Sequence, residues 1–247
     1  MWLRRMALPI AIAVAGLGSS AGHAADAIRQ EKVQFAQGAS EATIRGVLKG
    51  DQTVDYRVDA GAGQTLAVVL NGSNAQNHFN VLPPGSADVA MFVGQDGGGF
   101  KRILPSDGDY TVRVYLMRPA ARRNESSNYT LTVGVTGTPF APLPAAKDAL
   151  VPGTPFHASA TLACTPPFEM KPQQCDAFVI RRGFDGTATV EARGANGLRR
   201  RILFVKGEPT ASDAGDPMSF ARDGDTTIVK IAPDERYAIP DAFIRGG

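Results

Sequence analysis

Few residues of this chain have the types and spacing that catalysis or metal binding requires. Beyond the first 24 residues the only histidines are His78 and His157. Neither lies in a His-Glu-x-x-His arrangement or beside cysteine at the spacing of a zinc site. No Gly-x-Ser-x-Gly elbow occurs in the same stretch, so a serine-histidine-aspartate triad is not indicated. We therefore expect a protein that is not an enzyme and that has no cofactor and no metal.

Two Asp-Gly-Asp sequences bring carboxylates close together, around Gly108 and around Gly224. Such a sequence is typical of a turn, and loose calcium binding is the alternative. The glycine run at 97–99 lacks the Lys-Ser/Thr end of a phosphate loop, which favours a hairpin tip. Because carboxylates are numerous, a hydrolase that uses two of them stays open as a minor alternative.

The only two cysteines are Cys164 and Cys175. In an oxidising compartment a pair this close in sequence predicts one local disulfide. Closing so short a loop removes roughly 3 kcal/mol of unfolded-state entropy in the simple chain model. The bond would also leave no free thiol to act as a nucleophile.

The amino terminus has the features of a secretory signal. Arg4 and Arg5 precede an apolar stretch at 6–17, and small residues lead to a cleavage point after Ala24 or Ala25. About a dozen apolar residues cannot span a hydrocarbon core of roughly 30 Å. We predict a signal peptide over residues 1–24 and a periplasmic or secreted protein without a membrane anchor.

Charge argues against nucleic acid as a partner. The chain has 26 Lys+Arg and 24 Asp+Glu, and residues 1–24 contain two arginines and no acid. Without that segment the two signs balance. A neutral protein has no overall field to attract nucleic acid or an anionic membrane.

The remaining sequence predicts strands throughout, because short alternating or β-branched runs recur between glycine, proline, asparagine and aspartate. Between 110 and 116, for example, Tyr110, Val112, Val114 and Leu116 fall on one face of a strand. The stretch 118–125 is polar and predicts a short helical turn. The expected strands are 32–35, 42–48, 54–58, 65–70, 79–82, 90–93, 100–104, 110–116 and 129–135 in the first half, and 157–164, 177–182, 187–192, 201–205, 218–221, 226–231, 236–239 and 242–244 in the second.

A change of composition divides the chain. Residues 137–155 contain five prolines and no strand pattern, as in a semi-rigid connector. We therefore predict an all-β protein with two small antiparallel β-sandwich or barrel domains, at 25–136 and 156–247, joined by this proline-rich linker. Each half is long enough to close a small core.

One part of the first half is more specific than generic β-structure. Its distinctive features are Leu104-Pro105, the Gly108-x-Tyr110 turn, Arg113-Val114 and the stretch 118–124. On these features residues 31–135 resemble the periplasmic inhibitors of i-type and g-type lysozymes. Those proteins are small β-sandwich modules, similar in build to the pre-peptidase C-terminal domains of secreted proteases. The resemblance implies the same sandwich and lysozyme as the partner.

The resemblance also implies a binding loop. In that family inhibition is attributed to a Ser-Gly-x-Tyr loop that enters the lysozyme cleft and engages its catalytic acids. Here Gly108 and Tyr110 hold the glycine and tyrosine positions, Asp107 holds the serine position, and Ser106 lies one residue earlier. Serine and tyrosine hydroxyls can both donate to a carboxylate. The expected partner-binding residues are Ser106, Asp107, Gly108 and Tyr110 in loop 104–110, together with Arg118, Arg122 and Arg123, which would complement an acidic cleft.

Each of these assignments has an alternative. Tyr110 could instead pin a β-sandwich corner through its hydroxyl. The arginines of 118–123 could be a solvated surface run, and the basic cluster 197–201 is typical of a solvated strand end. The whole protein could be a non-inhibitory secreted module that binds glycan, envelope or another protein.

Overall fold

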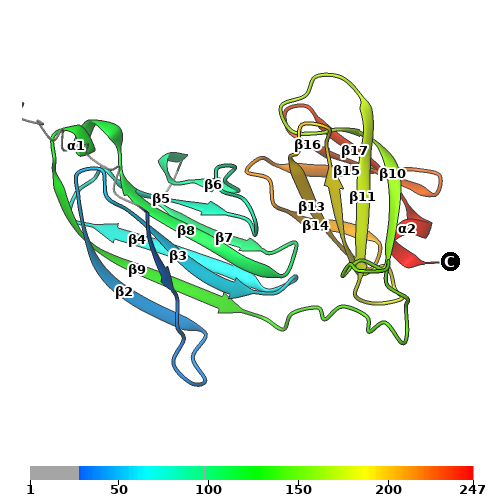
Figure 1. Cartoon of the computed structure of the whole chain (residues 1–247), viewed down its shortest axis with the longest axis horizontal. Coiled ribbons are helices and arrows are strands. Elements are labelled where there is room, and N and C mark those ends of the chain that lie inside the picture. The colour runs from blue at the N-terminus through cyan, green and yellow to red at the C-terminus, as the bar shows by residue number, and fades with distance from the viewer. Residues whose placement is uncertain (1–27, 97, 247) are drawn as a thin grey trace, which may run out of the picture.

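The computed structural model describes residues 28–96 and 98–246. The predicted signal peptide, residues 1–24, lies outside the described residues. The described chain forms two β-rich parts, which we call the first unit (29–136) and the second unit (158–245). Figure 1 shows them next to each other, joined by an extended connector.

The first unit is a sandwich of two sheets. One sheet has the order β1-β3-β8-β5-β6 and the other β2-β9-β4-β7. Neighbouring strands are antiparallel, except that β1 runs parallel to β3. The elements are β1 (Arg29–Lys32), β2 (Glu41–Lys49), β3 (Thr53–Ala60), β4 (Thr65–Gly72), β5 (Asn77–Leu82), β6 (Phe92–Val93), η1 (Gly94–Asp96), β7 (Gly99–Ile103), β8 (Gly108–Leu116), α1 (Arg118–Arg122) and β9 (Ser126–Thr136).

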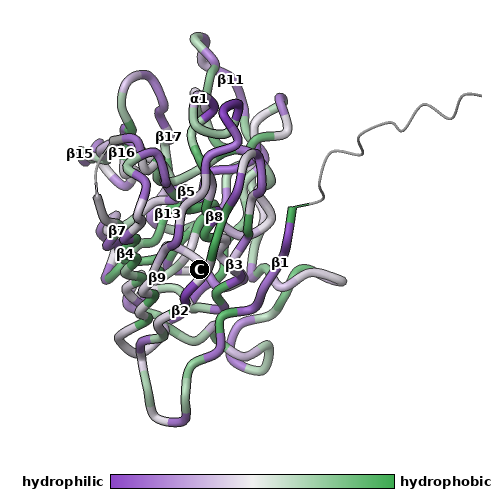
Figure 2. Tube along the Cα trace, turned by 90° about the vertical axis from the view of Figure 1, so that its left-hand side faces the viewer, coloured by the Kyte–Doolittle hydropathy of each residue, from purple (hydrophilic) through white to green (hydrophobic). Residues whose placement is uncertain are grey.

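Alternation along the strands builds the core of the first unit. In β8 the side chains of Tyr110, Val112, Val114 and Leu116 are all buried, as their spacing predicts. Burying each such side chain stabilises the fold by roughly 1.5–3 kcal/mol. In Figure 2 hydrophobic positions recur in β8, whereas β1 at the sheet edge is hydrophilic along its length. The strand that carries the expected loop is therefore anchored in the core.

The second unit is one antiparallel sheet of eight strands, ordered β14-β13-β12-β11-β10-β17-β16-β15. The sheet curls into a nearly closed barrel around a core that includes Phe204 and Tyr237. Phe243 and Ile244 of α2 add to that core. The elements are β10 (Ala158–Thr165), β11 (Gln173–Arg181), β12 (Ala188–Arg193), β13 (Arg199–Val205), β14 (Glu208–Ser212), β15 (Met218–Asp223), β16 (Thr226–Ile231), β17 (Glu235–Pro240) and α2 (Asp241–Arg245).

The predicted all-β class is confirmed, with three local departures. The predicted strand 32–35 is wrong, because β1 ends at Lys32 and the following residues are not in a strand. The alternation of Val33 and Phe35 reflects side chains that pack on the core. The predicted strand 242–244 is wrong, because these residues belong to helix α2. A run of three apolar residues is too short to distinguish a period of two from one of 3.6. Strand β14 has no counterpart among the expected strands, since Pro209 and its small polar neighbours give no strand pattern.

The connector is hydrogen bonded to both units. The amide of Phe140 donates to the carbonyl of Ala62, and the amide of Leu143 donates to the carbonyl of Arg181. A small apolar cluster joins the units at the same place, with Ala62 on one side and Leu203 on the other. Each unit thus has its own core, and a third, smaller one lies between them.

Candidate functional site

The expected binding loop lies at the end of the first unit that faces the second. Its Ser106 is only 6% exposed and Tyr110 is fully buried. The Tyr110 hydroxyl donates to the Ser106 carbonyl at 2.9 Å and lies 3.3 Å from the Ser106 hydroxyl. Burial raises the pKa of the Tyr110 phenol, so the donor stays protonated. This is the geometry of a tyrosine corner, in which the ring belongs to the core and the hydroxyl fixes the loop.

Asp107 is the most heavily bonded residue of the loop. Arg182 donates to its two carboxylate oxygens, at 3.2 and 2.9 Å, and the Arg182 side chain is completely buried. The amide of Ala62 donates to the same carboxylate at 2.9 Å. Arg182 also donates to Thr189 Oγ1 and to the Phe140 carbonyl. Asp107, at the position where the expected binding loop has serine, therefore forms a bidentate ion pair with the second unit.

Two further contacts fix the loop. The hydroxyl of Thr189 donates to the Pro105 carbonyl at 2.7 Å. Gly108 has a φ of +135°, and a Cβ atom there would lie 2.9 Å from the Cβ of Pro84. Only glycine meets both requirements, so this position is set by the backbone geometry of the loop.

Arginines from both units extend the contact between them. Arg201 donates to the Pro84 carbonyl, and Arg102 donates to the carbonyls of Ala214 and Gly215. The bonds are 2.8 to 3.0 Å long. The loop therefore lies within an extended interface rather than at a free end of the sandwich.

The basic cluster 197–201 is not the solvated strand end that its sequence suggests. Arg200 is buried and pairs with Asp213 at 3.0 Å and with Glu235 at 2.6 Å. Arg201 pairs with Glu191 at 2.8 Å. The acids come from other strands and from the segment after β14, so the spacing within the cluster could not reveal them. Within the cluster, Arg199 is exposed.

Arg118, Arg122 and Arg123 lie away from the loop. They belong to α1 and its carboxyl end, which follow β8, whereas the loop precedes β8. The nine residues of β8 separate the two groups by roughly 27 Å at the usual rise per residue. Arg123 also pairs with Glu125 at 2.6 Å. The structure thus brings Ser106, Asp107 and Tyr110 together but does not bring these arginines to them.

The histidines have structural partners. His157 is buried, accepts a bond from the Arg181 amide at 3.0 Å, and lies 2.9 Å from the Leu143 carbonyl. His78 lies 3.3 Å from the Gly94 carbonyl. The described part of the chain has no group of three or more histidine, cysteine, aspartate or glutamate residues that could hold a metal. Within residues 28–96 and 98–246, no helix is both long enough and apolar enough to cross a bilayer.

Sequence reasoning missed Arg182, whose side chain organises the contact. It directly follows β11, where a second arginine, Arg181, is also buried and pairs with Asp148 at 3.0 Å. Two adjacent arginines at the end of an apolar strand were the available signal. Their partners lie 33 and 75 residues away in sequence, so the signal did not indicate them.

No family model matches the chain. The chain is 27% identical, over 106 residues, to the inhibitor of g-type lysozyme of Escherichia coli (strain K12), a match that covers 42% of this chain and 78% of that protein. It is also similar to two solved periplasmic inhibitors of g-type lysozyme. The Aeromonas hydrophila protein is 34% identical with a TM-score of 0.40, and the Salmonella Typhimurium protein is 26% identical with a TM-score of 0.35. These matches cover 44% of this chain and 97% and 98% of those chains. The resemblance predicted from the first half is confirmed for that share of the molecule.

Proposed function

We propose that this chain, similar over 44% of its length to periplasmic inhibitors of g-type lysozyme, is itself a periplasmic or secreted protein that binds and inhibits a g-type lysozyme. The supporting observation is the identity of 27% over most of a curated inhibitor. A binding role, rather than catalysis, agrees with the residues at hand, since the histidines and cysteines have structural partners.

Inhibition would use loop 104–110, with Ser106 and Tyr110 as hydroxyl donors to the acids of the enzyme cleft. In the structure these two hydroxyls bond within the loop, and Asp107 bonds to Arg182. A carboxylate at position 107 would also repel a catalytic acid. Entry of this loop into a cleft therefore requires the second unit to release Asp107 and Pro105, and requires the buried Tyr110 hydroxyl to leave the Ser106 carbonyl.

A second candidate function follows from the same contact. Asp107 already forms an ion pair with Arg182 of the same chain. This pairing also favours a non-inhibitory binding protein that contacts its partner through another surface. We further propose that 25–136 and 156–247 are two separate domains and that 137–155 is the proline-rich linker between them. The ion pair between Asp107 and Arg182 would then be one of the contacts that hold the two domains together.

The test is a turbidity assay of cell lysis by g-type, i-type and c-type lysozymes. The full protein without residues 1–24, its Asp107→Ser variant and an Asp109→Ser control would each be added. Asp109 lies two residues away and pairs with Arg57 at 2.7 Å on the surface, so the control removes an equivalent charge. We expect selective inhibition of the g-type enzyme, strengthened by Asp107→Ser and unchanged by Asp109→Ser. If no variant inhibits any lysozyme, the second candidate function stands.

A further inference from the structure

An exposed apolar loop joins β10 to β11 at the top of the second unit in Figure 1. Its Phe168 and Met170 are 85% and 88% exposed, more than any other large hydrophobic residue in the described chain. Phe168 also has a φ of +61°, a conformation that aromatic residues rarely adopt. Two large apolar side chains held next to each other in water are typical of an interaction site.

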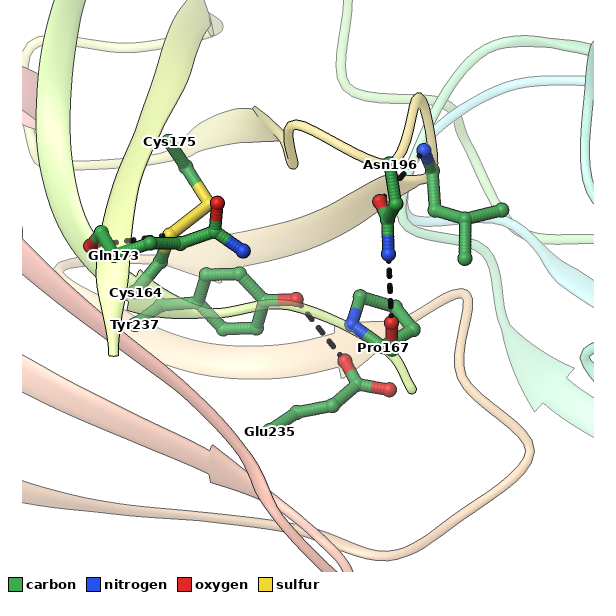
Figure 3. Close-up of a disulfide and its surroundings, with 8 residues drawn as sticks. Cys164, Pro167, Gln173, Cys175, Asn196, Glu235 and Tyr237 are labelled. Atoms are coloured by element: carbon green, nitrogen blue, oxygen red, sulfur yellow. Dashed lines mark hydrogen bonds between the residues drawn. A yellow bond between two sulfur atoms is a disulfide. The ribbon is translucent and has the colours of Figure 1, made fainter. Parts of the chain in front are cut away.

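The loop is held in a fixed position. A disulfide between Cys164 and Cys175 joins the two strands at its base, as the sequence predicts. Figure 3 shows Asn196 donating to the Pro167 carbonyl, at 3.0 Å, on the other side of the loop. A constrained loop loses little conformational freedom when it binds, so contacts made by its exposed side chains contribute more fully to affinity.

A groove of about 660 Å³ lies beside this loop, and both units form it. The first unit contributes an apolar wall that includes Val89 and Phe92. Phe92 is partly buried and packs against Phe79 and Phe100 at centroid distances of 5.1 and 5.5 Å, so this wall is rigid. From the second unit, Phe168 and its neighbours in the loop also line the groove. The groove can therefore receive an apolar side chain.

The charge around the groove is unbalanced. Glu169, Asp216 and Asp234 line it, and none forms an ion pair with another described residue. The two lining arginines already have acceptors within the protein. Arg102 donates to backbone carbonyls, and Arg200 is bonded to two carboxylates. The charged side chains that line the groove and have no ion-pair partner among the described residues are therefore acidic, which favours a cationic ligand.

We propose that the 166–172 loop and this groove form a docking surface for a protein partner that presents a cationic segment with an apolar side chain. The apolar side chain enters between Phe168 and the Phe92 wall, and lysine or arginine residues on either side meet the three carboxylates. This surface is distinct from loop 104–110, so the proposal does not depend on lysozyme inhibition.

The probe is a fluorescent peptide with a central phenylalanine-leucine pair and two lysines on each side. One control peptide has serines in place of the apolar pair, and a second has glutamates in place of the lysines. Binding to the full protein without residues 1–24 is followed by NMR titration and by fluorescence anisotropy at low and high salt. We expect saturable binding of the first peptide, much weaker binding of both controls, and a loss of affinity at high salt.

Two variants locate the site. Phe168→Ser combined with Met170→Ser should weaken binding about tenfold, since exposed apolar anchors commonly dominate such contacts. Phe184→Ser, at a 62% exposed position on another turn of the second unit, is the matched control and should bind like the wild type. Because all three side chains project into solvent, thermal unfolding should be unchanged.

Any one of three results overturns the proposal. The first is that the lysine peptide shows no saturable binding. The others are that the double variant binds this peptide as tightly as the wild type, or that the glutamate peptide binds as tightly as the lysine peptide. A parallel titration with a chito-oligosaccharide distinguishes the other class of ligand. If the sugar binds and the double variant abolishes that binding, the surface recognises glycans and the polypeptide assignment is refuted.

Discussion

Replacement of Asp107 by serine tests the contact between the units most directly. The change leaves the buried Arg182 guanidinium with only Thr189 and the Phe140 carbonyl as acceptors. Removing one partner of a buried ion pair costs about 3–5 kcal/mol. The Asp107 side chain is 44% exposed, so solvent screens part of that interaction. We therefore expect a loss of about 2 kcal/mol in the free energy of unfolding.

The assay is unfolding by urea and by heat. For a protein of this length a loss of about 2 kcal/mol lowers the Tm by about 4–8 °C. Asp109→Ser removes the Arg57–Asp109 pair, whose side chains are 40% and 43% exposed, and should cost less than about 1 kcal/mol. Arg182→Met and the double variant with Asp107→Ser complete a double-mutant cycle, which we expect to give a coupling of about 1–2 kcal/mol. Equal midpoints for the two serine variants, together with a coupling near zero, would refute the reasoning.

Three other outcomes follow from the described contacts. Tyr110→Phe removes the hydroxyl that bonds to the loop and should lower the free energy of unfolding by about 1 kcal/mol, measured in urea. Replacing both Cys164 and Cys175 by serine should cost roughly 3 kcal/mol, and mass spectrometry of the unreduced protein should find the two peptides linked. Burial raises the pKa of Tyr56, Tyr110 and Tyr237 above the ordinary value of 10.0. Their neutral forms stabilise the fold fully below that value, so the urea midpoint should fall as the pH rises above it, and a flat profile would contradict this account.

Much of the fold could be predicted because local patterns determine it. In β8 a strict alternation of apolar residues gave both the strand and its buried face. The cysteine spacing gave the disulfide, because two isolated cysteines leave one pairing. Helix α2 was not predicted because three apolar residues carry no period, and two of the strands it contacts, β11 and β12, lie far away in sequence.

The site was harder to predict, because its decisive partners are remote in sequence. The loop and its tyrosine could be located from the Gly108-x-Tyr110 pattern. The pairing of Asp107 with Arg182, 75 residues later, could not, since it depends on how the two units meet. Similarly, Arg200 looked solvated because its partner Glu235 lies 35 residues further on, in a strand of the same barrel.

The buried guanidinium of Arg182 also bears on how this protein can evolve. Its acceptors come from three parts of the chain, namely Asp107 in the first unit, Phe140 in the connector and Thr189 in the second unit. A recombination breakpoint within 137–155 would separate this arginine from its carboxylate and leave a buried charge uncompensated. Replacement of Asp107 by serine likewise leaves the Arg182 guanidinium without a carboxylate unless position 182 changes as well. Exchanging either half alone would therefore have to supply a new acceptor for Arg182 or a new donor for Asp107.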